Sequence, residues 1–153
     1  AMSATMRNAA RRGAVLVIFA ASLITFMSFM ALVIDVGYLY ALKARIQGVC
    51  DASALATLAA LDPAQPAASQ ERFARGLARR LLQVNGLELA NYQITLEPTV
   101  AGGPPARIRI AGREELNAFF AQAIGRRTFV VGVYTQAGAS LGKNGHFDAT
   151  LEE

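Results

Sequence analysis

Side chains that could carry out acid–base, nucleophilic or metal chemistry are few and scattered in this 153-residue chain. The only histidine, His146, lies in a glycine-rich stretch far from the only cysteine, Cys50, so the sequence predicts neither a Cys–His pair nor a zinc cluster. Glu114–Glu115 and Glu152–Glu153 are adjacent carboxylates, but neighbours on a helix point apart and terminal residues are mobile. We expect no catalytic residue, no metal site and no cofactor, and we expect Cys50 to be a small buried hydrophobe.

Asp35 is the charged residue under the clearest physical constraint. It directly follows residues 14–34, a run of 21 residues without a charge. Because a carboxylate is costly inside lipid, Asp35 either marks a membrane boundary or pairs with a basic or hydrogen-bonding neighbour within a helix bundle. The boundary is the simpler interpretation.

A second charged group is the row Arg72, Arg75 and Arg79, which share one face of a predicted helix. Such a row could bind phosphate or a lipid headgroup, but a solvated helix face is the more common case, and we favour it. The formal net charge is +4; without three arginines near the start, 15 − 3 = 12 basic residues face 11 acidic ones. This balance offers no general case for binding nucleic acid.

The apolar run of residues 14–34 is long enough to cross a bilayer, which needs about 20 helical residues. A cleaved leader is the main alternative, but the run is long for a leader core, and no small-residue cleavage site follows it, so an uncleaved signal anchor fits better. Arg7, Arg11 and Arg12 precede the run, which places the N-terminus in the cytoplasm and the rest of the chain outside it.

The helix is predicted to continue to residue 61, because residues 35–61 contain no proline and are rich in helix formers. Small residues recur every four positions in this part, which stacks them on one face and lets another backbone approach closely. We expect this row to be a packing surface for the chain's own head or for a neighbouring subunit. Its members are Ala44, Gly48, Ala52, Ala56 and Ala60.

Residues 62–69 read as a linker, and a second helix is predicted from Ser69, as its cap, to about Val84, ended by Asn85–Gly86. Its expected buried stripe is Phe73, Leu77, Leu81 and Val84. Together with residues 1–13 as a basic leader and residues 14–61 as the long helix, this gives a head of residues 70–137 and a polar tail of residues 138–153.

Alternation of apolar and polar residues predicts strands at 92–97, 107–110 and 127–137. Between the second and third, residues 114–124 read as a helix, with glutamates at its start and Gly125 at its end. The order α-α-β-β-α-β predicts an α+β fold with a small antiparallel three-stranded sheet and two helices. A right-handed crossover would give the spatial strand order 2-1-3, and the tail is expected to be irregular.

Four short segments point to a family: residues 11–15 (RRGAV), residues 35–40 (DVGYLY), Gln47, and residues 51–56 (DASALA). In this order and spacing around an apolar span they resemble the N-terminal region of TadE/TadG-like proteins of the tight-adherence (Tad, or Flp) pilus system, over about the first 60 residues. The resemblance implies a pilin-like envelope protein of pilus biogenesis. Pilin-like members are cut by a prepilin peptidase after a glycine and then carry glutamate at the fifth position, whereas a cut after Gly13 would place Ile18 there.

The sequence is compatible with two main functions. One is a membrane-resident assembly factor or minor pilin in the bacterial inner membrane, with an extracytoplasmic head. The other is a major structural subunit that polymerises through its N-terminal helix into an extracellular filament or tube. The expected partners are the membrane, other pilus-assembly or pilin-like subunits, and further copies of the chain. A third and weaker possibility is an anion-binding module that uses the arginine face.

Overall fold

The computed structural model describes residues 2–62, 64–98, 105–120, 125, 128–141 and 147–151. The chain divides into two compact units. The first consists of Ala1–Leu39 and Ala118–Arg127, and the second of Tyr40–Asn117 and Thr128–Glu153.

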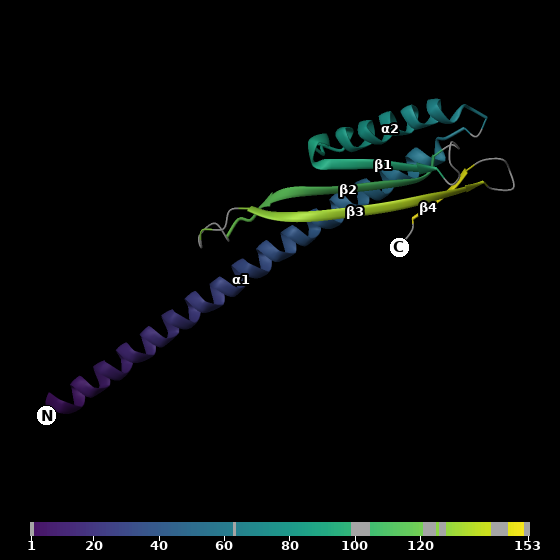
Figure 1. The fold of residues 1–153 in the computed structure, drawn as a ribbon. Helices are drawn as coiled ribbons and strands as arrows, with labels where there is room; N and C mark the ends of the chain where they lie inside the picture. Colours follow the sequence, from purple (N-terminus) through teal and green to yellow (C-terminus); the bar gives the residue numbers. More distant parts are fainter. Residues whose placement is uncertain are drawn as a thin grey trace. The chain divides into compact units, whose positions relative to one another are not determined.

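The first element is a single α-helix, α1 (Met2–Ala59), which confirms the long N-terminal helix (Figure 1). Three polar residues interrupt its apolar part, and each hydroxyl donates to the carbonyl oxygen four residues earlier, at 2.8–2.9 Å, from Ser22, Thr25 and Ser28. These bonds satisfy the hydroxyl protons within the helix itself, which suits a segment with an apolar surround.

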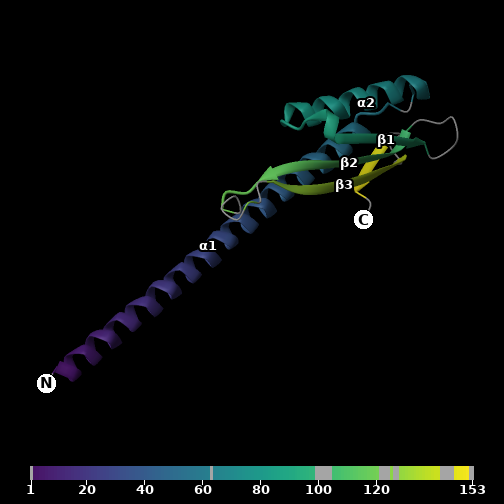
Figure 2. The same cartoon turned by 60° about the vertical axis from the view of Figure 1, so that its left-hand side comes forward.

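The second unit is built on a four-stranded antiparallel sheet. Its strands are β1 (Tyr92–Pro98), β2 (Pro105–Asn117), β3 (Thr128–Leu141) and β4 (Phe147–Leu151), in the spatial order β1-β2-β3-β4. The helix α2 (Ala67–Val84) and a 3-10 turn (Leu89–Asn91) precede them, and Figures 1 and 2 show α2 alongside β1. The class is α+β, as predicted.

One hydrophobic core joins the end of α1, α2 and one face of this sheet. Cys50, Ala54 and Leu58 of α1 are fully buried at four-residue intervals, and Ile108 and Ile110 of β2 face them from the sheet side. Most of the helix side chains that enter this core are small, so the helix and sheet backbones can come close together. A fully buried leucine such as Leu58 contributes about 1.5–3 kcal/mol to stability.

The face of α2 that enters the core differs from the prediction. Ala74, Ala78 and Leu82 are fully buried, whereas Phe73 and Val84 are 52% and 77% exposed. The prediction assigned the largest side chains to the core, but the four-residue period is satisfied one position later by alanines, which allow closer packing. The helix also begins two residues before Ser69, and no side chain caps it. Its end at Asn85 and Gly86 is confirmed, with Gly86 at φ +83°.

The helix predicted for residues 114–124 is wrong as far as residue 120, and residues 121–124 lie outside the described part. Glu114 to Asn117 instead extend β2, because they pair with Val131 to Thr128 of β3. The helical spacing of apolar residues there was real, but a neighbouring valine-rich strand offers ladder hydrogen bonds and side-chain packing that override a weak helix preference.

Two further predictions about the sheet are wrong. Without a crossover, β2 and β3 form a hairpin, so β3 lies beside β2 and the strand order 2-1-3 is wrong. The predicted irregular tail is also wrong for residues 138–141 and 147–151, which pair as the end of β3 and as β4. The sheet therefore has four strands where three were expected. His146, Glu152 and Glu153 lie outside the described residues.

Candidate functional site

In the first unit, the apolar part of α1 is left uncovered by the residues that the structure describes. Residues 13–59 contain an 18-residue window of mean hydropathy 2.5, and no residue in that window is buried. Large side chains such as Ile18, Phe26 and Phe29 are each about two-thirds exposed. A continuous apolar patch of this size is not stable in water, so this helix is a candidate membrane span or assembly surface.

Asp35, at the end of that surface, is 4% exposed. Its Oδ1 accepts the backbone N–H of Phe119 at 2.9 Å and that of Phe120 at 3.1 Å, and its Oδ2 accepts the Phe120 N–H at 2.9 Å. The hydrogen-bonding neighbour that a carboxylate needs near lipid therefore comes from the same chain, at the tip of the β2–β3 hairpin. Hydrogen bonds to an ionised acceptor are stronger than neutral ones.

One turn after Asp35, an aromatic contact reinforces this link. The rings of Tyr38 and Phe119 lie 5.1 Å apart between centroids, at an interplanar angle of 62°. This edge-to-face arrangement is favourable by about 0.5–1.5 kcal/mol beyond the area buried. The outer surfaces of these rings remain open: Tyr38 is 40% exposed, Phe119 64% and Phe120 49%.

In the second unit, a polar cluster fastens α1 to β3. The side-chain amide of Gln47 donates to Asp51 Oδ1 at 2.9 Å, to the Tyr134 carbonyl oxygen at 2.8 Å and to Thr135 Oγ1 at 2.9 Å. The Thr135 hydroxyl in turn donates to Asp51 Oδ1 at 2.6 Å. Thr135 is only 3% exposed, so this cluster satisfies polar groups at the helix–sheet contact.

The small residues predicted as a packing surface are all exposed, four of them on α1 and Ala60 directly after its end, away from the core that Cys50, Ala54 and Leu58 enter. A Cβ added at Gly48 would meet no atom within 4 Å. This row therefore does not pack on the described part of the chain's own head. Its members are Ala44, Gly48, Ala52, Ala56 and Ala60.

The comparison with protein families bears on this same helix. Residues 13–65 match the family described as "Putative Flp pilus-assembly TadE/G-like". This N-terminal region is TadE/G-like. Neither the curated proteins nor the solved structures contain a match to the chain. The match confirms the resemblance over residues 13–65 and, with the apolar helix, fits an envelope protein associated with the Tad pilus system.

The residues that carried the resemblance acquire a physical role within the TadE/G-like region. Asp35 holds the hairpin tip, while Gln47 and Asp51 hold β3. Sequence reasoning had identified Asp35 but had missed Thr135. A signal for Thr135 existed, because it occupies an inward-facing strand position between Val133 and Ala137.

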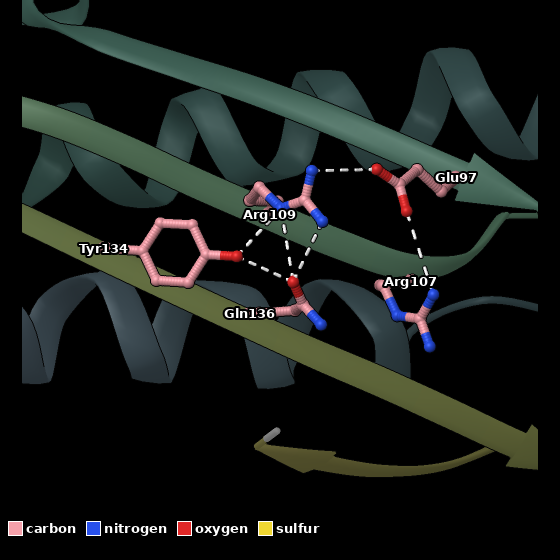
Figure 3. A network of polar contacts seen from close by, with 5 residues as sticks. All are labelled: Glu97, Arg107, Arg109, Tyr134 and Gln136. Atoms are coloured by element: carbon pink, nitrogen blue, oxygen red, sulfur yellow. Dashed lines mark hydrogen bonds and ion pairs between the residues drawn. The ribbon is translucent and has the colours of Figure 1, made fainter. Parts of the chain in front are cut away.

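The sheet face opposite the TadE/G-like helix carries a polar network (Figure 3). Arg109 pairs with Glu97 at 3.0 Å and donates from Nε to the Tyr134 hydroxyl oxygen at 2.9 Å and from Nη2 to Gln136 Oε1 at 3.0 Å. Arg107 lies 3.8 Å from the other Glu97 oxygen. Glu97 is thus shared by two arginines, and exposed pairs of this kind contribute little stability.

Beside this network is an open depression of about 610 Å³, lined by Asn91, Gln93, Arg113 and Tyr134 together with strand backbone. Among the described residues, no group of three or more His, Cys, Asp or Glu side chains is placed to hold a metal ion.

The arginine row of α2 is partly used within the chain. Arg75 pairs with Glu71 at 3.1 Å and donates to the Ile94 carbonyl oxygen at 3.1 Å, and Arg72 donates to the Ala68 carbonyl oxygen. Arg79 is exposed.

Cys50 is fully buried as predicted; burial, and then the charges of Asp51 and Glu114, raise the pKa of its thiol to about 11. A thiol in that state is a poor nucleophile at neutral pH.

Proposed function

We propose that this chain is a non-enzymatic, pilin-like envelope protein of Tad-type pilus biogenesis that is anchored or polymerised through its N-terminal helix. One observation carries the proposal: the helix that matches the TadE/G-like family also presents an uncharged apolar surface over residues 14–34 in which no residue is buried. At about 1.5 Å per residue, 21 residues span about 31 Å, which is the thickness of a bilayer core.

The proposed orientation follows from charge. Arg7, Arg11 and Arg12 precede the span, and their side chains lie outside the described part of the structure. Positive charge before a first span favours a cytoplasmic N-terminus, so residues 1–13 are the cytoplasmic leader of an uncleaved signal anchor and the α+β head is extracytoplasmic.

The proposed assembly surface is the exposed small-residue row on α1 and at Ala60, directly after its end. Its five members recur at four-residue intervals and leave the helix backbone open to close approach by another helix. A second TadE/G-like or pilin-like subunit is the partner that suits such a face, because helix–helix contact through small residues needs no large complementary pocket.

The alternative function is a major structural subunit of an extracellular filament or tube. The same exposed apolar surface supports it, because residues 14–34 can be shielded from water by copies of themselves as well as by lipid. Shearing cells and quantifying this chain by mass spectrometry separates the two. Retention in the membrane fraction supports the anchored assembly factor, and dominance of the sheared appendages supports the filament subunit. Recovery as a detergent-independent monomer would refute both.

A matched pair of substitutions tests the assembly surface. Gly48→Leu and Gly76→Leu each place leucine at an exposed helical glycine where an added Cβ meets no atom within 4 Å. Both should slightly favour the helix, by up to about 1 kcal/mol. Only Gly48→Leu should reduce co-purification of tagged and untagged copies or of other pilus components. Equal assembly by both variants contradicts the proposed surface.

A further inference from the structure

The aromatic tip of the β2–β3 hairpin has no obvious role in a water-soluble head. Phe119 and Phe120 expose most or half of their rings, although Asp35 holds their backbone in place. Three hydrogen bonds to one buried carboxylate hold these two apolar rings at the surface. Their exposure to water is unfavourable unless something covers the rings.

The depth of this tip along α1 indicates what covers it. If residues 14–34 fill the apolar core of a bilayer, Asp35 lies at its edge, and Tyr38 lies about 4.5 Å further out at 1.5 Å per residue. The headgroup layer on each side is roughly 5–8 Å thick, so Tyr38 falls within it. The Phe119 ring, 5.1 Å from the Tyr38 ring, belongs to the same first unit and lies beside that level.

We propose that Phe119, Phe120 and Tyr38 form a lipid-interface contact on the extracytoplasmic side, and that Asp35 fixes the hairpin tip at that depth. Tyrosine rings favour the boundary between headgroups and acyl chains because they combine an apolar body with a polar hydroxyl, and phenylalanine rings at this level can face the acyl chains. The two backbone N–H groups that such a site could not leave unpaired are supplied with an acceptor by Asp35. The buried carboxylate is, in turn, screened from lipid by the tip. This inference rests on the proposed membrane anchoring.

The chain contains no tryptophan, so a single introduced indole reports on one place. The full-length variants Phe119→Trp and Phe120→Trp are reconstituted in vesicles of phosphatidylethanolamine and phosphatidylglycerol. Phe26→Trp, within the span, serves as the lipid control, and Phe73→Trp, exposed on α2, as the water control. Quenching is compared between lipids brominated near the headgroup, lipids brominated deep in the acyl chain, and aqueous acrylamide.

The probes at positions 119 and 120 should be quenched most by shallow bromines, that at position 26 by deep bromines, and that at position 73 by acrylamide. Quenching of both hairpin probes by acrylamide alone overturns the lipid contact. Protection from every quencher also overturns it, because the tip is then covered by protein. If position 26 is not lipid-quenched, the membrane anchoring itself fails, which distinguishes the two failures.

A second variant tests the role of the carboxylate. In the background Asp35→Ala, the probe at position 119 should lose shallow-bromine quenching and become open to acrylamide, while the probe at position 26 keeps its deep quenching. Unchanged quenching at position 119 overturns the claim that Asp35 sets the depth of the tip.

Discussion

Replacing Asp35 by alanine should release the hairpin tip locally. The carboxylate accepts two backbone N–H groups through three contacts of 2.9, 3.1 and 2.9 Å. A hydrogen bond to a charged group contributes about 1.5–3 kcal/mol, so losing two at the lower value costs about 3 kcal/mol. Because 1.4 kcal/mol corresponds to a factor of ten, docking of the tip should weaken by about a hundredfold.

Amide hydrogen exchange measures this loss directly. The Phe119 and Phe120 amides, followed by NMR in detergent micelles, should exchange about a hundred times faster in Asp35→Ala than in the original chain. Asp35→Asn is the matched control, because it keeps an oxygen acceptor of the same shape without the charge. A neutral bond contributes about 0.5–1.5 kcal/mol, so its exchange rates should fall between the other two.

The location of the change matters as much as its size. The Ile110 amide, in the centre of the sheet, should exchange at the same rate in all three proteins, since it takes no part in the Asp35 contact. Unchanged exchange at Phe119 and Phe120 in Asp35→Ala would refute the reasoning. Equal acceleration at Ile110 would also refute it, because the carboxylate would then stabilise the whole fold rather than the tip.

Three further predictions concern the second unit. Gly112→Ala should lower stability by about 1–3 kcal/mol in thermal unfolding, because the new Cβ would overlap the Tyr92 ring; an unchanged midpoint contradicts this overlap. Thr135→Val should cost about 1–3 kcal/mol by removing the hydroxyl that donates to Asp51 at 2.6 Å, and a neutral effect in denaturant titration contradicts that bond. The pKa of Cys50 is raised from 9.0 to about 11, so its neutral thiol stabilises the folded state fully below pH 9, and that stability is lost as pH rises towards 11. Cys50→Ala should remove this part of the alkaline loss, and rapid alkylation of the native thiol at pH 8 contradicts its burial.

The elements with strong local signals were predictable from the sequence. Residues 14–34 lack charge over a bilayer's thickness, and no proline interrupts the following helix, so α1 needs no tertiary information. Strand β1 alternates clearly, and Asn85–Gly86 ends α2 because glycine reaches φ +83° at no steric cost. Asp35 stood out for the same local reason, as a carboxylate directly after an apolar run.

Other features depended on partners distant in sequence. Residues 114–117 are strand only because Val130 and Val131 lie opposite, and that pairing turns an expected crossover into a hairpin and changes the strand order. The burial of Ala74 and Ala78 in place of Phe73 depends on how closely α2 can approach the core.

The contacts of Asp35 combine a feature that the local sequence predicts with one that depends on the tertiary fold. The sequence by itself determined that a carboxyl side chain stands at the end of an apolar helix and that its oxygens need hydrogen-bond partners there. Only the tertiary structure decided that the satisfying groups are the amides of Phe119 and Phe120, more than 80 positions away. The reason is physical: every non-proline residue has a backbone N–H group, so no side-chain type in the sequence indicates which of them will bind a given carboxylate. The fold alone selects the donors.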